Sequence, residues 1–303
     1  MKAILVGAVE STRLALEVIN AARDWEAAAV ITLPLRLAKR HSDFVDLRPL
    51  AEKAGAEIID APNSNAPEIL DRVRDIAPDV TFVIGWSQIC KPEFIEAAGG
   101  NIIGYHPGPL PQLRGRAVIP WTILLEYPIT GSTLFWLDEG MDSGDILAQE
   151  FIHVASDETA TVLYEKHQQA LGRILADGLA SIASGSPRRI KQDHRYATWT
   201  AKRTPADGEI DWRAPAQDAL KLIRATTRPY PGAFTRRKDE TLVIWSAEHW
   251  PAQDRHAASP GQIILRDGDG FAIQCGDGAL WVTDWTLSGA DDLRVHAVFG
   301  RDS

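Results

Sequence analysis

The sequence predicts an α/β fold in which a mostly parallel sheet is followed by a smaller, β-rich C-terminal domain. In the first half, short apolar runs alternate with segments of helical periodicity, which is typical of parallel strands joined by covering helices. In the last third, strand-like runs are separated by turn sequences such as Asp269-Gly270 and Asp277-Gly278. We therefore expect a Rossmann-like sheet and then an OB-like barrel.

The first predicted strand is Ile4–Val6, which ends at Gly7, and the first predicted helix runs from Ser11 to Arg23 with Ser11 as its N-cap. The region after Gly7 lacks the second and third glycines of the dinucleotide-binding fingerprint, so NAD binding is not predicted. Further strands are predicted at Ala28–Leu33, Val80–Ile84, Ile102–Ile103 and Ser132–Leu137, and further helices at Arg48–Ala54 and Pro67–Ile76.

A long helix is predicted from Asp157 to Ser184, capped at Ser156 or Asp157 and ended by Gly185. The polar and basic sequence that follows is typical of a linker. We therefore predict a catalytic domain over residues 1–186, a linker over 187–204 and a C-terminal domain over 205–303. The apolar residues predicted to pack in the core are Val162, Leu163, Leu171, Ile174, Leu175, Leu179 and Ile182.

The C-terminal domain is predicted to open with a helix at Ala214–Thr226, after which Pro229, Pro231 and Gly232 break the chain. Short strands are predicted at Thr241–Trp245, Gln262–Leu265, Phe271–Gln274 and Leu280–Asp284.

Composition excludes several classes of protein. The 303 residues carry a formal net charge of -9, which argues against nonspecific binding to nucleic acid or anionic membranes. No apolar run approaches the roughly 20 residues needed to span a bilayer, and the N-terminal run is too short for a signal peptide. The two cysteines, Cys90 and Cys275, form no Cys-x-x-Cys motif. We expect a cytoplasmic protein.

The most unusual segment is His106–Arg116, with the sequence HPGPLPQLRGR. It follows the apolar run Ile102–Ile103, which places His106 just beyond the end of a strand, where open α/β sheets bind ligands. Its prolines and glycines hold the loop in one irregular shape. On chemistry alone, a rigid surface turn with an incidental histidine is an equal alternative.

A second segment, Asp138–Asp145, has the sequence DEGMDSGD. Its spacing does not match an EF-hand loop. A carboxylate near His106 would orient the imidazole and stabilise its protonated form, as general-base catalysis requires. The alternative is a solvated acidic turn.

Together these segments resemble the 10-formyltetrahydrofolate-dependent formyltransferase family. Its members include methionyl-tRNA formyltransferase, sugar N-formyltransferases and the hydrolase domain of 10-formyltetrahydrofolate dehydrogenase. In this family a histidine opens a Leu-Pro loop and an aspartate follows 36 residues later, which corresponds here to His106 and Asp142. The Leu110-Pro111 bond corresponds to one that is cis in some relatives. The similarity continues through Lys191–Asp193 and into Arg228–Thr235.

The resemblance implies direct formyl transfer without a metal. An unprotonated amine attacks the formyl carbon, His106 accepts the proton, and Asp142 holds His106. The family's catalytic asparagine falls on Gly104, which has no amide. Loss of an oxyanion donor typically slows an enzyme by two to three orders of magnitude, so a water, a backbone N–H or another side chain replaces it or the enzyme is slow.

The remaining site residues are implied by the same resemblance. The folate co-substrate is expected in a cleft formed by Gly85, Trp86, Ser87, Gln88, Asp138, Glu139 and Gly140. Trp86 is alternatively a core residue. Arg114 and Arg116 are expected to bind an anionic group of the acceptor, and solvation at the surface is their alternative.

The sequence of Leu110–Arg116 is similar to that of enzymes that formylate nucleotide-linked amino sugars, so a nucleotide-linked amino sugar is the expected acceptor. The alternatives are methionyl-tRNA formylation, hydrolysis of 10-formyltetrahydrofolate, which the dehydrogenase's hydrolase domain performs without the asparagine, and a non-catalytic folate- or nucleotide-binding module. From Thr204 to Ser303 there are 11 Lys and Arg against 15 Asp and Glu, a net charge of -4, which disfavours tRNA. The resemblance alone suggests a homodimer.

Overall fold

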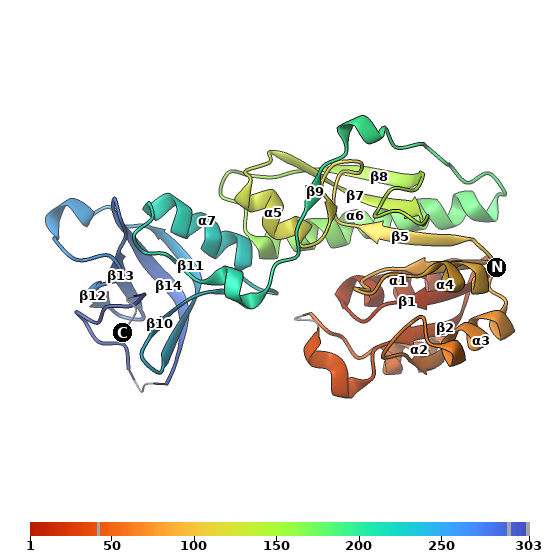
Figure 1. Ribbon diagram of the computed structural model, residues 1–303, viewed down its shortest axis with the longest axis horizontal. Coiled ribbons are helices and arrows are strands. Elements are labelled where there is room, and N and C mark those ends of the chain that lie inside the picture. Colours follow the sequence, from red (N-terminus) through yellow and green to blue (C-terminus); the bar gives the residue numbers. More distant parts are fainter. Residues whose placement is uncertain (41–42, 290–291, 301–303) are drawn as a thin grey trace. The chain divides into compact units, whose positions relative to one another are not determined.

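The computed structural model describes residues 1–40, 43–289 and 292–300 (Figure 1). The chain forms two compact units. Unit 1 comprises Met1–Val118, Ile129–His153 and Tyr164–Ala201, and unit 2 comprises Ile119–Pro128, Val154–Leu163 and Lys202–Ser303.

Unit 1 is built on a seven-stranded sheet with the order β3-β2-β1-β4-β5-β7-β8. Strands β1 to β5 pair in parallel, whereas β7 is antiparallel to both β5 and β8. The prediction of a mostly parallel sheet is therefore confirmed. The strands are β1 (Lys2–Val6), β2 (Glu26–Thr32), β3 (Glu57–Asp60), β4 (Val80–Val83), β5 (Ile102–His106), β7 (Ile129–Trp136) and β8 (Ile146–His153).

Helices cover both faces of this sheet. Alternation along β1 places Leu5 in one core, with residues of α1, α2 and α6, and places Ile4 and Val6 in the other core, with residues of α3 and α4. The helices of unit 1 are α1 (Glu10–Ala21), α2 (Arg48–Ala54), α3 (Pro67–Ile76), α4 (Pro92–Ala97) and α6 (Ala160–Ala183), whose first turn belongs to unit 2. Helix α5 (Val118–Leu124) belongs to unit 2 apart from its first residue. A two-stranded pair, β6 (Arg114–Gly115) and β9 (Trp199–Thr200), lies outside the main sheet.

Three local predictions are wrong. Helix α1 begins at Glu10, so Ser11 lies in its first turn, and the N–H of the N-cap Val9 donates to Thr12 Oγ1 (3.2 Å). Helix α6 begins at Ala160, later than predicted, and Val162 near its start is 43% exposed although the other predicted core residues of this helix are buried. His106 is the last residue of β5 rather than the residue beyond it.

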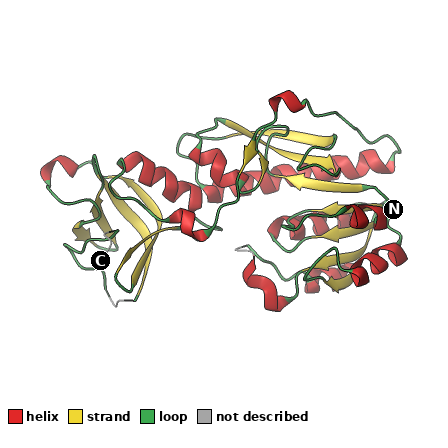
Figure 2. Cartoon of the chain, in the orientation of Figure 1, coloured by secondary structure: helices red, strands yellow, loops and turns green. Residues whose placement is uncertain are grey.

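Unit 2 contains a five-stranded antiparallel sheet with the order β10-β11-β14-β13-β12. Helix α7 (Ala216–Thr226) contributes Ile223 to a core that it shares with Leu242, Phe271 and Val282. Figure 2 shows the predominance of strands in this unit. The strands are β10 (Ala233–Arg237), β11 (Glu240–His249), β12 (Ile263–Asp267), β13 (Gly270–Gln274) and β14 (Ala279–Ser288). The predicted β-rich C-terminal domain is confirmed.

Among the described residues, the short 3₁₀ helices are η1 (Leu35–Arg40), η2 (His194–Tyr196), η3 (Pro205–Gly208) and η4 (Gln253–Arg255). Across the part of the chain that the structure describes, every helix is too short or too polar to cross a bilayer.

Candidate active site

His106 lies at the carboxyl end of β5 and is only 3% exposed. The loop that follows fits closely around its ring. A Cβ on Gly108 would lie 2.7 Å from Nε2 of His106, so a side chain at position 108 would displace the imidazole. The Leu110-Pro111 bond in this loop is cis.

The hydrogen bonds of His106 identify its free nitrogen. Nε2 lies 2.8 Å from the carbonyl oxygen of Leu113. A carbonyl oxygen can only accept, so Nε2 carries the proton and Nδ1 keeps the lone pair in the neutral ring. Leu113 adopts a φ of 56°, a left-handed conformation that is costly for leucine and that such sites retain only when the surroundings enforce it. Nδ1 is therefore the ring nitrogen that is free to accept a proton.

Asp142 faces that nitrogen, with Oδ2 3.5 Å from Nδ1. The same carboxylate oxygen accepts a hydrogen bond from the backbone N–H of Gly115 (2.8 Å), which fixes its direction. When Nδ1 takes a proton, the resulting imidazolium lies beside a carboxylate that is already oriented. The structure thus brings together the two residues that the family resemblance had paired.

Burial lowers the pKa of His106, and Asp142 and the Leu113 carbonyl partly offset this effect, whereas the Arg114 guanidinium adds to it. Desolvation is the largest cause because the charged form loses its hydration. The ring is therefore neutral at physiological pH and able to accept a proton at Nδ1.

Gly104 lies two residues before His106 on β5, so its missing side chain would project from the same face of the strand. That space is filled. A Cβ at position 104 would lie 2.5 Å from Cδ1 of Leu137 and 3.0 Å from the ring of Phe135. Apolar side chains thus occupy the space that a side chain at position 104 would need.

The residues predicted to bind folate lie in two loops of unit 1. After β4, Trp86 is half-buried and donates from Nε1 to Ser64 Oγ (3.2 Å), and Gln88 accepts from the N–H of Ser64 (3.1 Å). After β7, Oδ1 of Asp138 accepts from the N–H of Gly140 (3.0 Å) and from Ser143 Oγ (2.7 Å). Gly85 has a φ of 75°, and Ser87 and Glu139 are exposed.

The two predicted anion-binding arginines differ in position. Arg116 is exposed, whereas Arg114 is 4% exposed, so solvation at the surface is excluded for Arg114. Its Nη2 donates to Gln192 Oε1 (2.5 Å) and to His194 Nδ1 (3.1 Å). Sequence reasoning missed Gln192 and His194 because it assigned residues 187–204 to a linker, although Gln192 belonged to a family motif.

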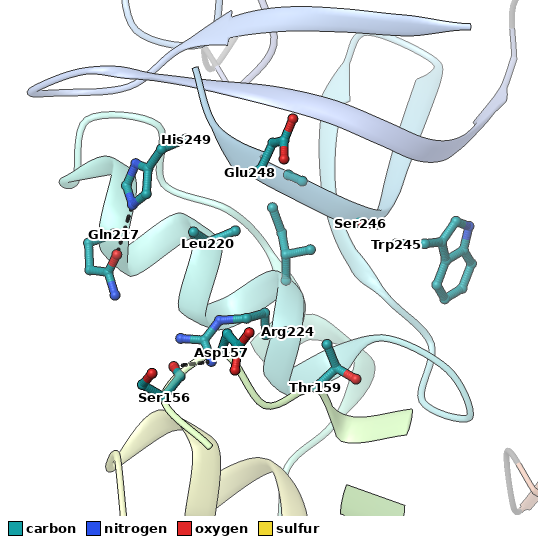
Figure 3. A pocket seen from close by; sticks show the side chains of 12 residues that line it. Ser156, Asp157, Thr159, Gln217, Leu220, Arg224, Trp245, Ser246, Glu248 and His249 are labelled. Carbon is teal, nitrogen blue, oxygen red and sulfur yellow. Dashed lines mark hydrogen bonds between the residues drawn. The ribbon is translucent and has the colours of Figure 1, made fainter. Parts of the chain in front are cut away.

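A hollow of about 480 Å³ lies within unit 2, between α7, β11 and residues 156–159 (Figure 3). Asp157 and Glu248 contribute carboxylates to its lining, and Gln217 is hydrogen-bonded to His249 (2.9 Å). Nη1 of Arg224 donates to the carbonyl oxygens of Ser156 and Glu158 (both 3.0 Å). A lining with two carboxylates and one engaged guanidinium is poorly suited to phosphate.

Within residues 1–40, 43–289 and 292–300, no three His, Cys, Asp or Glu side chains gather closely enough to hold a metal ion.

Comparison with known proteins identifies the family of this chain. The formyl transferase family matches residues 4–179, and the formyl transferase C-terminal domain matches residues 202–302. The chain is 31% identical to methionyl-tRNA formyltransferase of Akkermansia muciniphila over 278 residues, which are 90% of this chain and 88% of that protein.

Two solved structures share the fold at low identity. An N-formyltransferase from Helicobacter canadensis, in complex with folinic acid and dTDP-3-aminofucose, has a TM-score of 0.68 at 16% identity over 94% of this chain and 100% of that one. HypX from Aquifex aeolicus in complex with tetrahydrofolic acid has a TM-score of 0.66 at 17% identity. That alignment covers 93% of this chain but only 43% of HypX. The family matches, the curated relative and the His106–Asp142 pair together show that this chain belongs to the formyl transferase family.

Proposed function

We propose that this enzyme transfers the formyl group of 10-formyltetrahydrofolate to the primary amine of a nucleotide-linked amino sugar. The observation that carries the chemistry is the pairing of Nδ1 of His106 with the carboxylate of Asp142, while Nε2 is occupied by Leu113. This arrangement supplies one buried base with an oriented counter-charge.

In the proposed reaction the unprotonated amine attacks the formyl carbon, and a new C–N bond forms. Nδ1 of His106 takes the proton that the amine loses, and Asp142 stabilises the imidazolium. The bond between the formyl carbon and N10 of the folate then breaks as N10 receives a proton, which leaves a formamide and tetrahydrofolate. The proton that N10 receives is the one that Nδ1 of His106 took from the amine. The formyl carbon keeps its oxidation state, so the step requires no redox partner.

The folate co-substrate is proposed to lie against the loop Gly85–Gln88 and the loop Asp138–Gly140. Exposed apolar side chains accompany both loops: Ile89 is 78% exposed and Met141 is 59% exposed. Exposed apolar groups beside polar ones suit a flat, partly apolar pterin and aminobenzoyl system. The folate ligands named for the Helicobacter and Aquifex proteins support folate as the co-substrate.

The choice of a sugar nucleotide over tRNA rests on charge. Binding to tRNA depends on unengaged cations along the phosphate backbone. In unit 2 the basic residues Arg213, Lys221, Arg228, Arg236, Arg237 and Arg266 each form an ion pair with a carboxylate. Together with the net charge of -4 from Thr204 to Ser303, these ion pairs disfavour tRNA binding by the C-terminal domain.

Methionyl-tRNA is the second candidate acceptor because the curated relative at 31% identity is a methionyl-tRNA formyltransferase that aligns over 90% of this chain. Hydrolysis to formate is the third possibility, favoured by the apolar filling at Gly104. Both free cysteines accord with the reducing cytoplasm proposed as the site of action.

The test is an assay of tetrahydrofolate release from 10-formyltetrahydrofolate by purified enzyme. It is run without acceptor, with a panel of nucleotide-linked amino sugars that includes a dTDP-linked 3-amino sugar, and with methionyl-tRNA. We expect release with an amino sugar, together with a product heavier by one formyl group. Release only with tRNA, or equally fast without acceptor, would replace this proposal by the corresponding alternative. His106→Ala is the catalytic control.

A further inference from the structure

Gln192 is a buried residue in an otherwise exposed segment of unit 1. Gln192 is 6% exposed, whereas its neighbours Lys191 and Asp193 are exposed. A buried primary amide is costly unless its donors and acceptor are satisfied. The partners of Gln192 therefore indicate what this segment does.

All three hydrogen-bond partners of Gln192 lie in the two segments that contact His106 or carry Asp142. Nε2 donates to the carbonyl oxygens of Asp142 (2.9 Å) and Gly144 (2.7 Å), so both amide protons are used. Oε1 accepts from Nη2 of the buried Arg114 (2.5 Å). We call Arg114, Asp142, Gly144 and Gln192 the amide clamp.

The clamp joins the two segments that hold His106 and its counter-charge. On one side it holds Arg114, which lies between Leu113, whose carbonyl binds Nε2 of His106, and Gly115, whose N–H binds Asp142. On the other side it holds the backbone at Asp142, which adopts a left-handed φ of 51°. A backbone in that conformation stays in place only when its surroundings hold it.

The segment that carries Gln192 is itself anchored to the loop after His106. The N–H of Arg114 donates to the Thr198 carbonyl (2.8 Å), the N–H of Leu113 donates to Thr198 Oγ1 (2.9 Å), and β6 pairs with β9. Gln192 is thus presented to the Asp142 loop by a rigid support rather than by a free linker.

We propose that Gln192 is a positioning residue that, through Arg114 and the backbone of Asp142 and Gly144, sets the distance and direction between the Asp142 carboxylate and Nδ1 of His106. This inference rests on the proposed formyl transfer and deepens it. It assigns Arg114 to the clamp, so that other groups of the protein would bind the anionic group of the acceptor. An error of about 1 Å in such a pair costs about 100-fold in rate.

The test compares Gln192→Met with Gln192→Glu. Methionine keeps the volume and removes all three hydrogen bonds. Glutamate keeps an acceptor for Arg114 but places an oxygen against the carbonyls of Asp142 and Gly144. We expect kcat of both variants to fall 10- to 100-fold, with KM for folate and acceptor within about threefold. Asp193→Asn, the adjacent exposed residue, is the matched control and is expected to stay within twofold of wild type.

A second readout does not depend on activity. The charged groups facing His106 are Asp142, which raises its pKa, and Arg114, which lowers it. With the clamp broken, Asp142 is released from His106, so the pKa of His106 measured by imidazole NMR is expected to fall in Gln192→Met. In Asp193→Asn it is expected to match wild type.

The outcomes separate the two proposals. Absence of formyl transfer by wild type with every acceptor would refute the proposed function, while the NMR shift would still test the clamp. An unchanged titration of His106 in both Gln192 variants would overturn the clamp, as would a raised acceptor KM at unchanged kcat, which would return Arg114 to acceptor binding. If Gln192→Met does not fold, Gln192→Glu decides by the same measurements.

Discussion

At the scale of single residues, the chemistry of this site depends on which nitrogen of His106 is free. The Leu113 carbonyl occupies Nε2 and leaves Nδ1 facing Asp142 at 3.5 Å. Desolvation lowers the pKa of the ring, and Asp142 raises it again. The enzyme is therefore expected to work with a neutral His106 whose conjugate acid is stabilised by one carboxylate.

Asp142→Asn tests this arrangement. The variant removes the charge that raises the pKa of His106, so that pKa falls further below its ordinary value. The acid limb of the kcat profile is then expected to move to lower pH, and the plateau is expected to fall by about 10²–10⁴, the usual contribution of general acid–base catalysis. Glu150→Gln, which removes a carboxylate on β8 that pairs with Arg173 of α6, is the control. Movement of the limb to higher pH would contradict the assignment.

At the scale of elements, strand β5 is packed in a way that rules out a simple return of the family's asparagine. Position 104 pairs with Val83 of β4 and Phe135 of β7, and its side-chain space is filled by Leu137 and Phe135. Leu137 and Phe135 therefore fill the space that the family's asparagine side chain would need at position 104.

Gly104→Asn is expected to lower the free energy of unfolding by about 1–3 kcal/mol, the usual cost of overpacking a core. Adding Leu137→Ala removes the closest contact and is expected to recover most of this loss in urea titrations. Because an oxyanion donor is worth about 10²–10³ in rate, the double variant is expected to exceed Leu137→Ala alone in kcat by at least about tenfold. Equal rates would show that an amide at position 104 is not aligned with the developing charge.

At the scale of the whole of unit 1, a buried polar chain joins α6 to the sheet on the face opposite His106. Tyr105 and Ser132 lie 3.0 Å apart through their hydroxyls, and Ser132 Oγ lies 2.8 Å from Nδ1 of His167. Burial lowers the pKa of His167 to about 3. This histidine is therefore neutral in the folded protein at every pH at which the enzyme is expected to work.

The stability of the protein is expected to depend on pH through His167. The pKa of His167 is 6.5 in the unfolded chain and about 3 in the folded protein. Below pH 6.5 only the unfolded chain binds a proton at this residue, so the free energy of unfolding is unaffected above pH 6.5 and falls as the pH decreases toward 3. From pH 7.5 to 5.5 His167 accounts for a loss of about 1.4 kcal/mol. His167→Asn removes the titrating group. Between pH 7.5 and 5.5, the free energy of unfolding of this variant, measured in urea, is therefore expected to fall by about 1.4 kcal/mol less than that of wild type. An equal fall in both proteins would exclude His167 as the cause.

The sequence by itself determined the α/β class, the β-rich C-terminal domain, and the pairing of His106 with Asp142. Apolar periodicity predicts the strands and helices. The pairing of His106 with Asp142, 36 residues later, came from the resemblance to the formyltransferase family, because the residues alone left a surface turn as an equal alternative. Helix ends were less well determined, because Thr12 rather than Ser11 accepts the hydrogen bond at the start of α1.

Only the tertiary structure decided the surroundings of that pair. Gln192 reaches Arg114 from 78 positions away, and the space at Gly104 is filled by side chains from β7 and the residue after it. The tautomer of His106 depends on the carbonyl of Leu113, seven residues along an irregular loop. Periodicity carries no information on such contacts, because they arise when distant segments compete for the same space and the same hydrogen bonds.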